Sequence, residues 1–218
     1  MADNILSGPI QPPASGGKPK QLVVLLHGYG SNGDDLIGLA PYLARALPDA
    51  EFMSPNAPER SQLGFGFQWF GLGSLEPRDL VGGVEHARKA LDDFIDAALA
   101  ERGLATANLG LVGFSQGTMM ALDRALRRAD SAAAIVGFSG MIADSTLRLA
   151  KADKHPPILL VHGTADPVVP FKRMGEAEKT LKDAGFPVDA MARPGLVHSV
   201  DAEGVQRAAA FLARNLAA

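Results

Sequence analysis

Residues 107–126, ANLGLVGFSQGTMMALDRAL, contain the most informative fold signal of the sequence. It opens with the apolar run 109–112, which is typical of a strand buried on both faces of a parallel sheet. A Gly-x-Ser-x-Gly turn centred on Ser115 comes next, and its two glycines permit a tight turn where side chains would collide. Met119, Met120 and Leu122 then continue with helical spacing. Strand, serine turn and helix in direct succession predict a nucleophile elbow, which presents a serine hydroxyl for attack.

Strands and helices alternate along the rest of the chain, and this order predicts an α/β fold with a mostly parallel central sheet and helices on both faces. The segment 1–20 is rich in Pro, Gly and Ser, and we expect it to be flexible. No linker or shift in composition interrupts 21–218, which predicts a single domain. The expected strands are 21–26, 108–113, 132–138, 157–163 and 187–192, together with a strand in 50–58 that runs into a proline-marked loop. The expected helices are 36–47, 79–101, 117–128, 171–184 and 201–216.

Composition excludes several classes of function. The net charge of −3 gives no basic footprint for nucleic acid or an anionic membrane. The absence of cysteine excludes disulfides, thiolate zinc sites and a cysteine nucleophile. The first 21 residues show no signal peptide, and no apolar run approaches the roughly 18 residues of a membrane span. We therefore expect a cytoplasmic protein without stable membrane insertion; a homodimer is compatible with the sequence.

A serine nucleophile needs a base and a carboxylate that orients the base. In this fold class they follow the serine in the order Asp then His, each beyond a strand. His198 follows the last expected strand, whereas His27 and His162 end earlier strands and come too soon for that order. The sequence therefore predicts His198 as the base.

Asp166 is the matching carboxylate. It lies in the turn-rich loop HGTADPVVP after the expected strand 157–163. The alternative is that Asp166 only caps the helix that begins near Phe171.

Acyl transfer also needs N–H donors that stabilise an oxyanion. The residue after the nucleophile, Gln116, supplies one backbone N–H. The second is expected from Tyr29, because Gly28 and Gly30 leave its backbone accessible in the Gly-rich turn after the first strand. Alternatively, Gly28 serves only a tight turn.

Two further features remain. Residues 137–139 repeat the letters Gly-Phe-Ser, but no glycine stands at position 141, so Ser139 is expected to be a polar residue at a strand end. The aperiodic segment 60–78 is rich in aromatic residues. From it we expect four residues to line an apolar acyl or alcohol pocket, unless they only pack the loop: Leu63, Phe65, Trp69 and Phe70.

The motifs together resemble the phospholipase/carboxylesterase family of α/β-hydrolases, which includes acyl-protein thioesterases. They run in order from about residue 20 to 216 and end with the late histidine: LLHGYGSNGDDL, SPNAP, QWF, GFSQGTMMAL, GFSG and HGTADPVVP. The resemblance implies an α/β-hydrolase fold without a cap domain, no cofactor and no metal. It also implies the same triad and the same two oxyanion amides. One departure is Val197, where the family commonly has Gly before the histidine.

The expected activity is that of a serine carboxylesterase, which cleaves small or apolar carboxylic esters through an acyl-enzyme intermediate. The alternatives within the family are an acyl-protein thioesterase and a lysophospholipase. An alternative from another class is a ligand-binding protein that keeps the fold without catalysis. An intact triad order and an oxyanion turn argue against that alternative, because a receptor needs neither.

Overall fold

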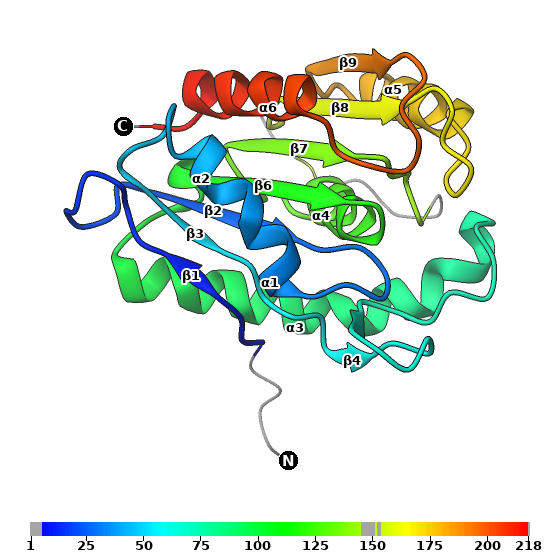
Figure 1. The fold of residues 1–218 in the computed structure, drawn as a ribbon, viewed down its shortest axis with the longest axis horizontal. Coiled ribbons are helices and arrows are strands. Elements are labelled where there is room, and N and C mark those ends of the chain that lie inside the picture. Colours follow the sequence, from blue (N-terminus) through cyan, green and yellow to red (C-terminus); the bar gives the residue numbers. More distant parts are fainter. Residues whose placement is uncertain (1–5, 145–150, 152–153, 218) are drawn as a thin grey trace.

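The computed structural model of the protein describes residues 6–144, 151 and 154–217. Its centre is a seven-stranded sheet in the order β1-β3-β2-β6-β7-β8-β9, and every neighbouring pair is parallel except β1 with β3 (Figure 1). The expected mostly parallel sheet is confirmed. The strands are β1 Ile10–Gln11, β2 Gln21–Leu26, β3 Ala50–Met53, β6 Leu109–Phe114, β7 Ala134–Phe138, β8 Ile158–Gly163 and β9 Val188–Arg193.

Helices cover both faces of the sheet. The helices α3 Pro77–Arg102, α4 Gln116–Arg127 and α5 Lys172–Asp183 share one apolar core with the sheet, and α1 Gly33–Leu36, α2 Ala40–Leu43 and α6 Ala202–Asn215 share the other. Side chains of a strand alternate between the two cores, as in β2, where Val24 belongs to the first and Val23 to the second. In the described part of the chain, no helix combines the length and apolarity that crossing a membrane requires.

The expected helix 36–47 is interrupted. Asn32 caps an earlier start, since its side chain accepts a hydrogen bond from the Asp35 N–H at 2.9 Å. Pro41 lies in the first turn of α2 and has no N–H to continue the helical ladder, and a 3₁₀ turn over Ile37–Leu39 joins α1 to α2. The aperiodic segment after β3 also contains a short hairpin that the sequence did not predict, β4 Glu59–Arg60 with β5 Phe67–Gln68.

The N-terminal segment differs from the flexible stretch expected over 1–20. Residues 1–5 lie outside the described residues, but β1 pairs with β3 and Leu6 is buried in the core. The Ser54 N–H donates to the Pro9 carbonyl at 3.0 Å, and the Asn56 N–H donates to the Ser7 carbonyl at 2.9 Å. Backbone pairing therefore holds the described part of this segment along the edge of the sheet.

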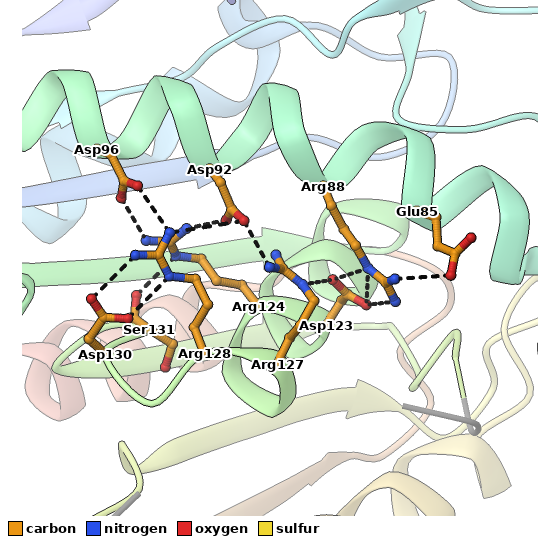
Figure 2. Close-up of polar contacts among 10 residues, drawn as sticks. All are labelled: Glu85, Arg88, Asp92, Asp96, Asp123, Arg124, Arg127, Arg128, Asp130 and Ser131. Atoms are coloured by element: carbon orange, nitrogen blue, oxygen red, sulfur yellow. Dashed lines mark hydrogen bonds and ion pairs between the residues drawn. The ribbon is translucent and has the colours of Figure 1, made fainter. Parts of the chain in front are cut away.

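Charged side chains join α3 to α4 (Figure 2). The guanidinium of Arg124 is fully buried; it bonds to Asp92, to Asp96 at 3.2 Å and to the Ser131 carbonyl at 3.1 Å. Burial lowers the pKa of Arg124, while the two carboxylates act in the opposite direction. These partners compensate the buried charge of Arg124; an unpaired guanidinium at this position would destabilise the fold.

Arg88 of α3 extends this connection to the loop after β7. It contacts Asp123 of α4 at 2.8 Å and Asp144 at 2.7 Å, and both carboxylates are almost wholly buried. Burial alone would lower the pKa of Arg88, but hydrogen bonds to these two carboxylates raise it. The pairs fix α4 against α3, and α4 is the helix that begins directly after Ser115.

Candidate active site

Ser115 sits in a strained turn between β6 and α4. Its backbone has φ 54° and ψ −114°, a conformation that non-glycine residues rarely adopt. The Ser115 N–H donates to the Phe138 carbonyl at 2.8 Å. The neighbouring glycines are required sterically, because a Cβ at Gly113 would lie 2.4 Å from the Thr118 nitrogen and one at Gly117 only 1.9 Å from the Leu26 carbonyl oxygen. The sequence prediction of strand, tight turn and helix is confirmed.

The Gly-rich turn after β2 faces this serine. A Cβ built on Gly28 would lie 3.3 Å from the Ser115 Cβ, so the turn passes close to the elbow. Gly30 has a φ of 75°, and its N–H donates to the Phe67 carbonyl at 2.9 Å. Within the described residues, the Tyr29 N–H between them donates to no backbone carbonyl. Gln116 is the first residue of α4, and its N–H therefore has no partner within the helix.

His27 holds the Gly-rich turn from inside. Its Nε2 accepts a hydrogen bond from the Ala57 N–H at 2.9 Å, and its Nδ1 donates to the Gly28 carbonyl at 2.7 Å. This pattern requires the neutral imidazole with the proton on Nδ1. Burial is the main cause that lowers the pKa of His27 from its ordinary value. Its carbonyl also accepts from the Trp69 indole N–H at 2.9 Å.

The side chain of Gln116 has a role that the sequence did not reveal. Its Oε1 accepts from the Trp69 N–H at 2.9 Å, and its Nε2 donates to the Phe70 carbonyl at 2.7 Å. Two hydrogen bonds from one amide therefore join the start of α4 to the segment after β5. The spacing of 47 residues between Trp69 and Gln116 leaves no local sequence signal for the contact.

His198 and Asp166 meet as a pair. The His198 Nδ1 lies 2.7 Å from Asp166 Oδ2, and the Asp166 side chain is fully buried. The ring of His198 packs 4.9 Å from the ring of Phe114, the residue that precedes Ser115. The structure therefore brings the three sequence-predicted residues to one end of the parallel strands, after β6, after β8 and after β9.

The loop of Asp166 is fixed by its own carboxylate. The Oδ1 atom accepts from the N–H groups of Val168 at 2.8 Å and Val169 at 2.9 Å. The helix α5 begins later, at Lys172, and Phe171 at its N-cap makes no side-chain capping bond. The alternative interpretation of Asp166 as a cap of that helix is wrong.

Ser139 follows β7, as expected, but shares an unexpected feature with Ser115. Its φ is 48°, and its N–H donates to the Val161 carbonyl at 2.9 Å. The chain after it differs from the chain after Ser115, since the described residues 140–144 form no helix. The Ser139 hydroxyl is buried and finds no hydrogen-bond partner in the described residues.

The four aromatic-segment residues divide into two pairs. Leu63 and Phe65 are 54% and 66% exposed, and Leu63 lies beside Gly30 of the Gly-rich turn. Trp69 and Phe70 are buried in the apolar core under α3, a position that favours the alternative in which they pack the loop. The Trp69 hydrogen bonds to His27 and Gln116 explain its inward position, because they hold both its backbone and its indole.

Val197, the departure from the family pattern, is 53% exposed, and the next residue, His198, pairs with Asp166. The loop before His198 crosses β8 closely, where a Cβ on Gly163 would lie 2.1 Å from the Leu196 carbonyl oxygen. Val197 therefore adds an exposed apolar side chain next to the imidazole.

Comparison with known proteins gives a consistent result. The sequence profile of the phospholipase/carboxylesterase family matches residues 11–216. The chain is 27% identical to esterase YpfH of Escherichia coli, over 86% of this chain and 79% of that one. It is 28% identical to acyl-protein thioesterase 1 of Kluyveromyces lactis, over 90% and 92%. The crystal structure of esterase PE8 superposes with a TM-score of 0.90 at 40% identity, over 97% and 100%.

Proposed function

Because the chain belongs to the phospholipase/carboxylesterase family and is a hydrolase with the α/β-hydrolase fold, we propose that it is a serine carboxylesterase. Its substrates would be small or apolar carboxylic esters, cleaved through an acyl-enzyme on Ser115. The observation that carries the proposal is the strained Ser115 turn beside the hydrogen-bonded pair of His198 and Asp166.

In the first step, Ser115 Oγ attacks the ester carbonyl while His198 Nε2 takes the hydroxyl proton. The Asp166 carboxylate accepts from His198 Nδ1, which keeps Nε2 free for the serine and stabilises the imidazolium. His198 then gives its proton to the departing alcohol. Water, activated by the same imidazole, hydrolyses the acyl-enzyme and restores Ser115.

The oxyanion would be stabilised by the backbone N–H groups of Tyr29 and Gln116. Support comes from their positions: the Gly28–Gly30 turn passes the Ser115 Cβ, and the Gln116 N–H lies at the N-terminus of α4. The partial positive charge of a helix N-terminus favours an anion there. Such donors each contribute on the order of 100–1,000-fold in rate.

Leu63 and Phe65 would supply the apolar contact to the acyl or alcohol group. Both are exposed, and Leu63 lies next to the Gly-rich turn. Acyl-protein thioesterases among the relatives keep thioesters as the second candidate substrate class. Cytoplasmic location and a homodimer remain predictions from the sequence.

The test is hydrolysis of p-nitrophenyl acetate by the purified protein and three variants. Ser115→Ala should lower kcat by roughly 10⁴–10⁶-fold, and His198→Ala by a similar factor. Ser139→Ala is the matched control and should stay within about threefold of wild type. Comparison of kcat/KM for an ester and a thioester with the same acyl group then decides between the two substrate classes. Loss of activity in Ser139→Ala with near-normal Ser115→Ala would overturn the assignment.

A further inference from the structure

A second histidine lies against the carboxylate that orients His198. His162 is in β8, four residues before Asp166, and its side chain is only 1% exposed. Its Nε2 lies 2.9 Å from the Val169 carbonyl oxygen and 3.2 Å from Asp166 Oδ2. The ring of Phe171 meets the imidazole edge-on at 6.0 Å and confines it from the side.

These contacts determine which nitrogen carries the proton. A carbonyl oxygen only accepts hydrogen bonds, so His162 Nε2 must be protonated and must donate to Val169. The same nitrogen lies 3.2 Å from Asp166 Oδ2, so the N–H that bonds to Val169 also places its positive partial charge beside the carboxylate. His162 therefore binds the far end of the Asp166 loop through Val169 and lies in electrostatic contact with the carboxylate.

The two oxygens of the Asp166 carboxylate have different neighbours. Its Oδ1 accepts from the Val168 and Val169 N–H groups. Its Oδ2 faces His198 Nδ1 at 2.7 Å and His162 Nε2 at 3.2 Å. With the two backbone donors alone, the only neighbour of Oδ2 would be His198. Asp166 must itself orient His198, so a second neighbour such as His162 is needed to fix Oδ2.

We propose that His162 is a positioning residue for the esterase reaction: its Nε2–H bonds to the Val169 carbonyl, closes the 166–169 loop and lies against Asp166 Oδ2, and the carboxylate held in this way orients His198 toward Ser115. This inference rests on the proposed function. No proton moves to or from His162; it acts only by holding the carboxylate. Residues that orient metal ligands in this indirect way typically change activity by about 10–100-fold when removed, and we expect a similar range for the triad carboxylate.

The experiment compares two substitutions of similar length. His162→Gln keeps an N–H donor near the position of Nε2, whereas His162→Met fills the space without a donor. His155→Met is the control, because His155 stacks on Phe186 at 4.1 Å and, in the described chain, contacts no residue of the site. Each protein is assayed with p-nitrophenyl acetate, and the concentration of active sites is counted by titration with a fluorophosphonate.

We expect kcat per active site to fall about 10–100-fold in His162→Met with KM within about twofold. His162→Gln should return kcat to within about threefold of wild type, and His155→Met should leave it unchanged. A purely structural role predicts a lower melting temperature and fewer titratable sites at unchanged kcat per site, and this result would overturn the inference. So would an equal loss in the Gln and Met variants.

Failure of the proposed function gives a different result. In that case the wild-type protein neither hydrolyses the ester nor reacts with the fluorophosphonate. An active wild type with an unaffected His162→Met variant rejects only the role of His162.

Discussion

Gly117→Ala tests how closely the elbow helix must approach the sheet. In the structure, a Cβ on Gly117 would lie 1.9 Å from the Leu26 carbonyl oxygen and 2.4 Å from the Leu26 carbonyl carbon. Carbon and oxygen that are not bonded approach to about 3.3–3.6 Å. The N-terminus of α4 must therefore move away from β2 by roughly 1.5 Å to accept one methyl group. Both partners are backbone, so no side-chain rotation can relieve the contact.

This displacement acts directly on the reacting groups. Gln116 and Ser115 immediately precede Gly117, so their N–H and hydroxyl groups move with the helix. A misplacement of about 1 Å reduces rate by about 100-fold. Overpacking of a core costs about 1–3 kcal/mol in the free energy of unfolding. For a chain of this length, the loss corresponds to a decrease in melting temperature of roughly 2–12 °C.

The assay is kcat/KM for p-nitrophenyl acetate together with thermal unfolding of the same preparation. Gly175→Ala is the matched control, since Gly175 lies in α5 and a Cβ there meets no described atom within 4 Å. It should keep full activity and raise the free energy of unfolding by about 0.5–1 kcal/mol. A Gly117→Ala variant with activity within threefold of wild type and an unchanged melting temperature would refute the steric argument.

Three further predictions concern His27 in the Gly-rich turn, the ion pairs between α3 and α4, and the exposed side chains of Leu63 and Phe65. The pKa of His27 is lowered in the folded state, so the unfolded chain binds the extra proton; the free energy of unfolding should fall as pH drops below about 6.5 toward the folded pKa. Urea unfolding between pH 5 and 7.5 should show this dependence of the free energy of unfolding on pH in the wild type and a weaker dependence in His27→Gln. Equal dependence in the two proteins would contradict the role of His27. Arg88→Met leaves two buried carboxylates without this cation and should lower the free energy of unfolding by about 3–5 kcal/mol in denaturant titrations. The exposed Lys89→Met should lower it by less than about 1 kcal/mol, and similar losses in the two variants would show that burial of the ion pair does not matter. Replacing Leu63 and Phe65 by Ser should lower kcat/KM for a hexanoate ester about tenfold, equivalent to about 1.4 kcal/mol, and leave the acetate within twofold; equal effects on both esters would remove these side chains from the acyl site.

Much of this architecture could be predicted because its signals are local. Continuous apolar runs such as 21–26 and 109–112 become β2 and β6, and the long amphipathic pattern becomes α3. The Ser115 turn could be predicted because only glycine fits beside it, which leaves a direct trace in the sequence. The His198 and Asp166 pair followed from chain order, and the structure places their atoms 2.7 Å apart.

The features that sequence reasoning missed depend on distant partners. β1 has two residues and exists only through its pairing with β3, so no periodicity could reveal it. Aromatic content does not tell a buried ring from an exposed one, so the sequence leaves both interpretations of Trp69 open. Its inward position follows from hydrogen bonds to His27 and Gln116, residues far away in the chain. Chain order excludes His162 as the base, but its position four residues before Asp166 brings it to the same carboxylate.

The proposed mechanism requires that Ser115 becomes covalently acylated during turnover. The most direct measurement is mass spectrometry of the protein treated with a fluorophosphonate, together with peptide mapping over residues 107–126 and 134–144. The proposed function predicts one adduct per chain, located on Ser115, with none formed by Ser115→Ala and an undiminished amount formed by Ser139→Ala. An adduct on Ser139, or ester hydrolysis that persists after Ser115→Ala, would contradict it.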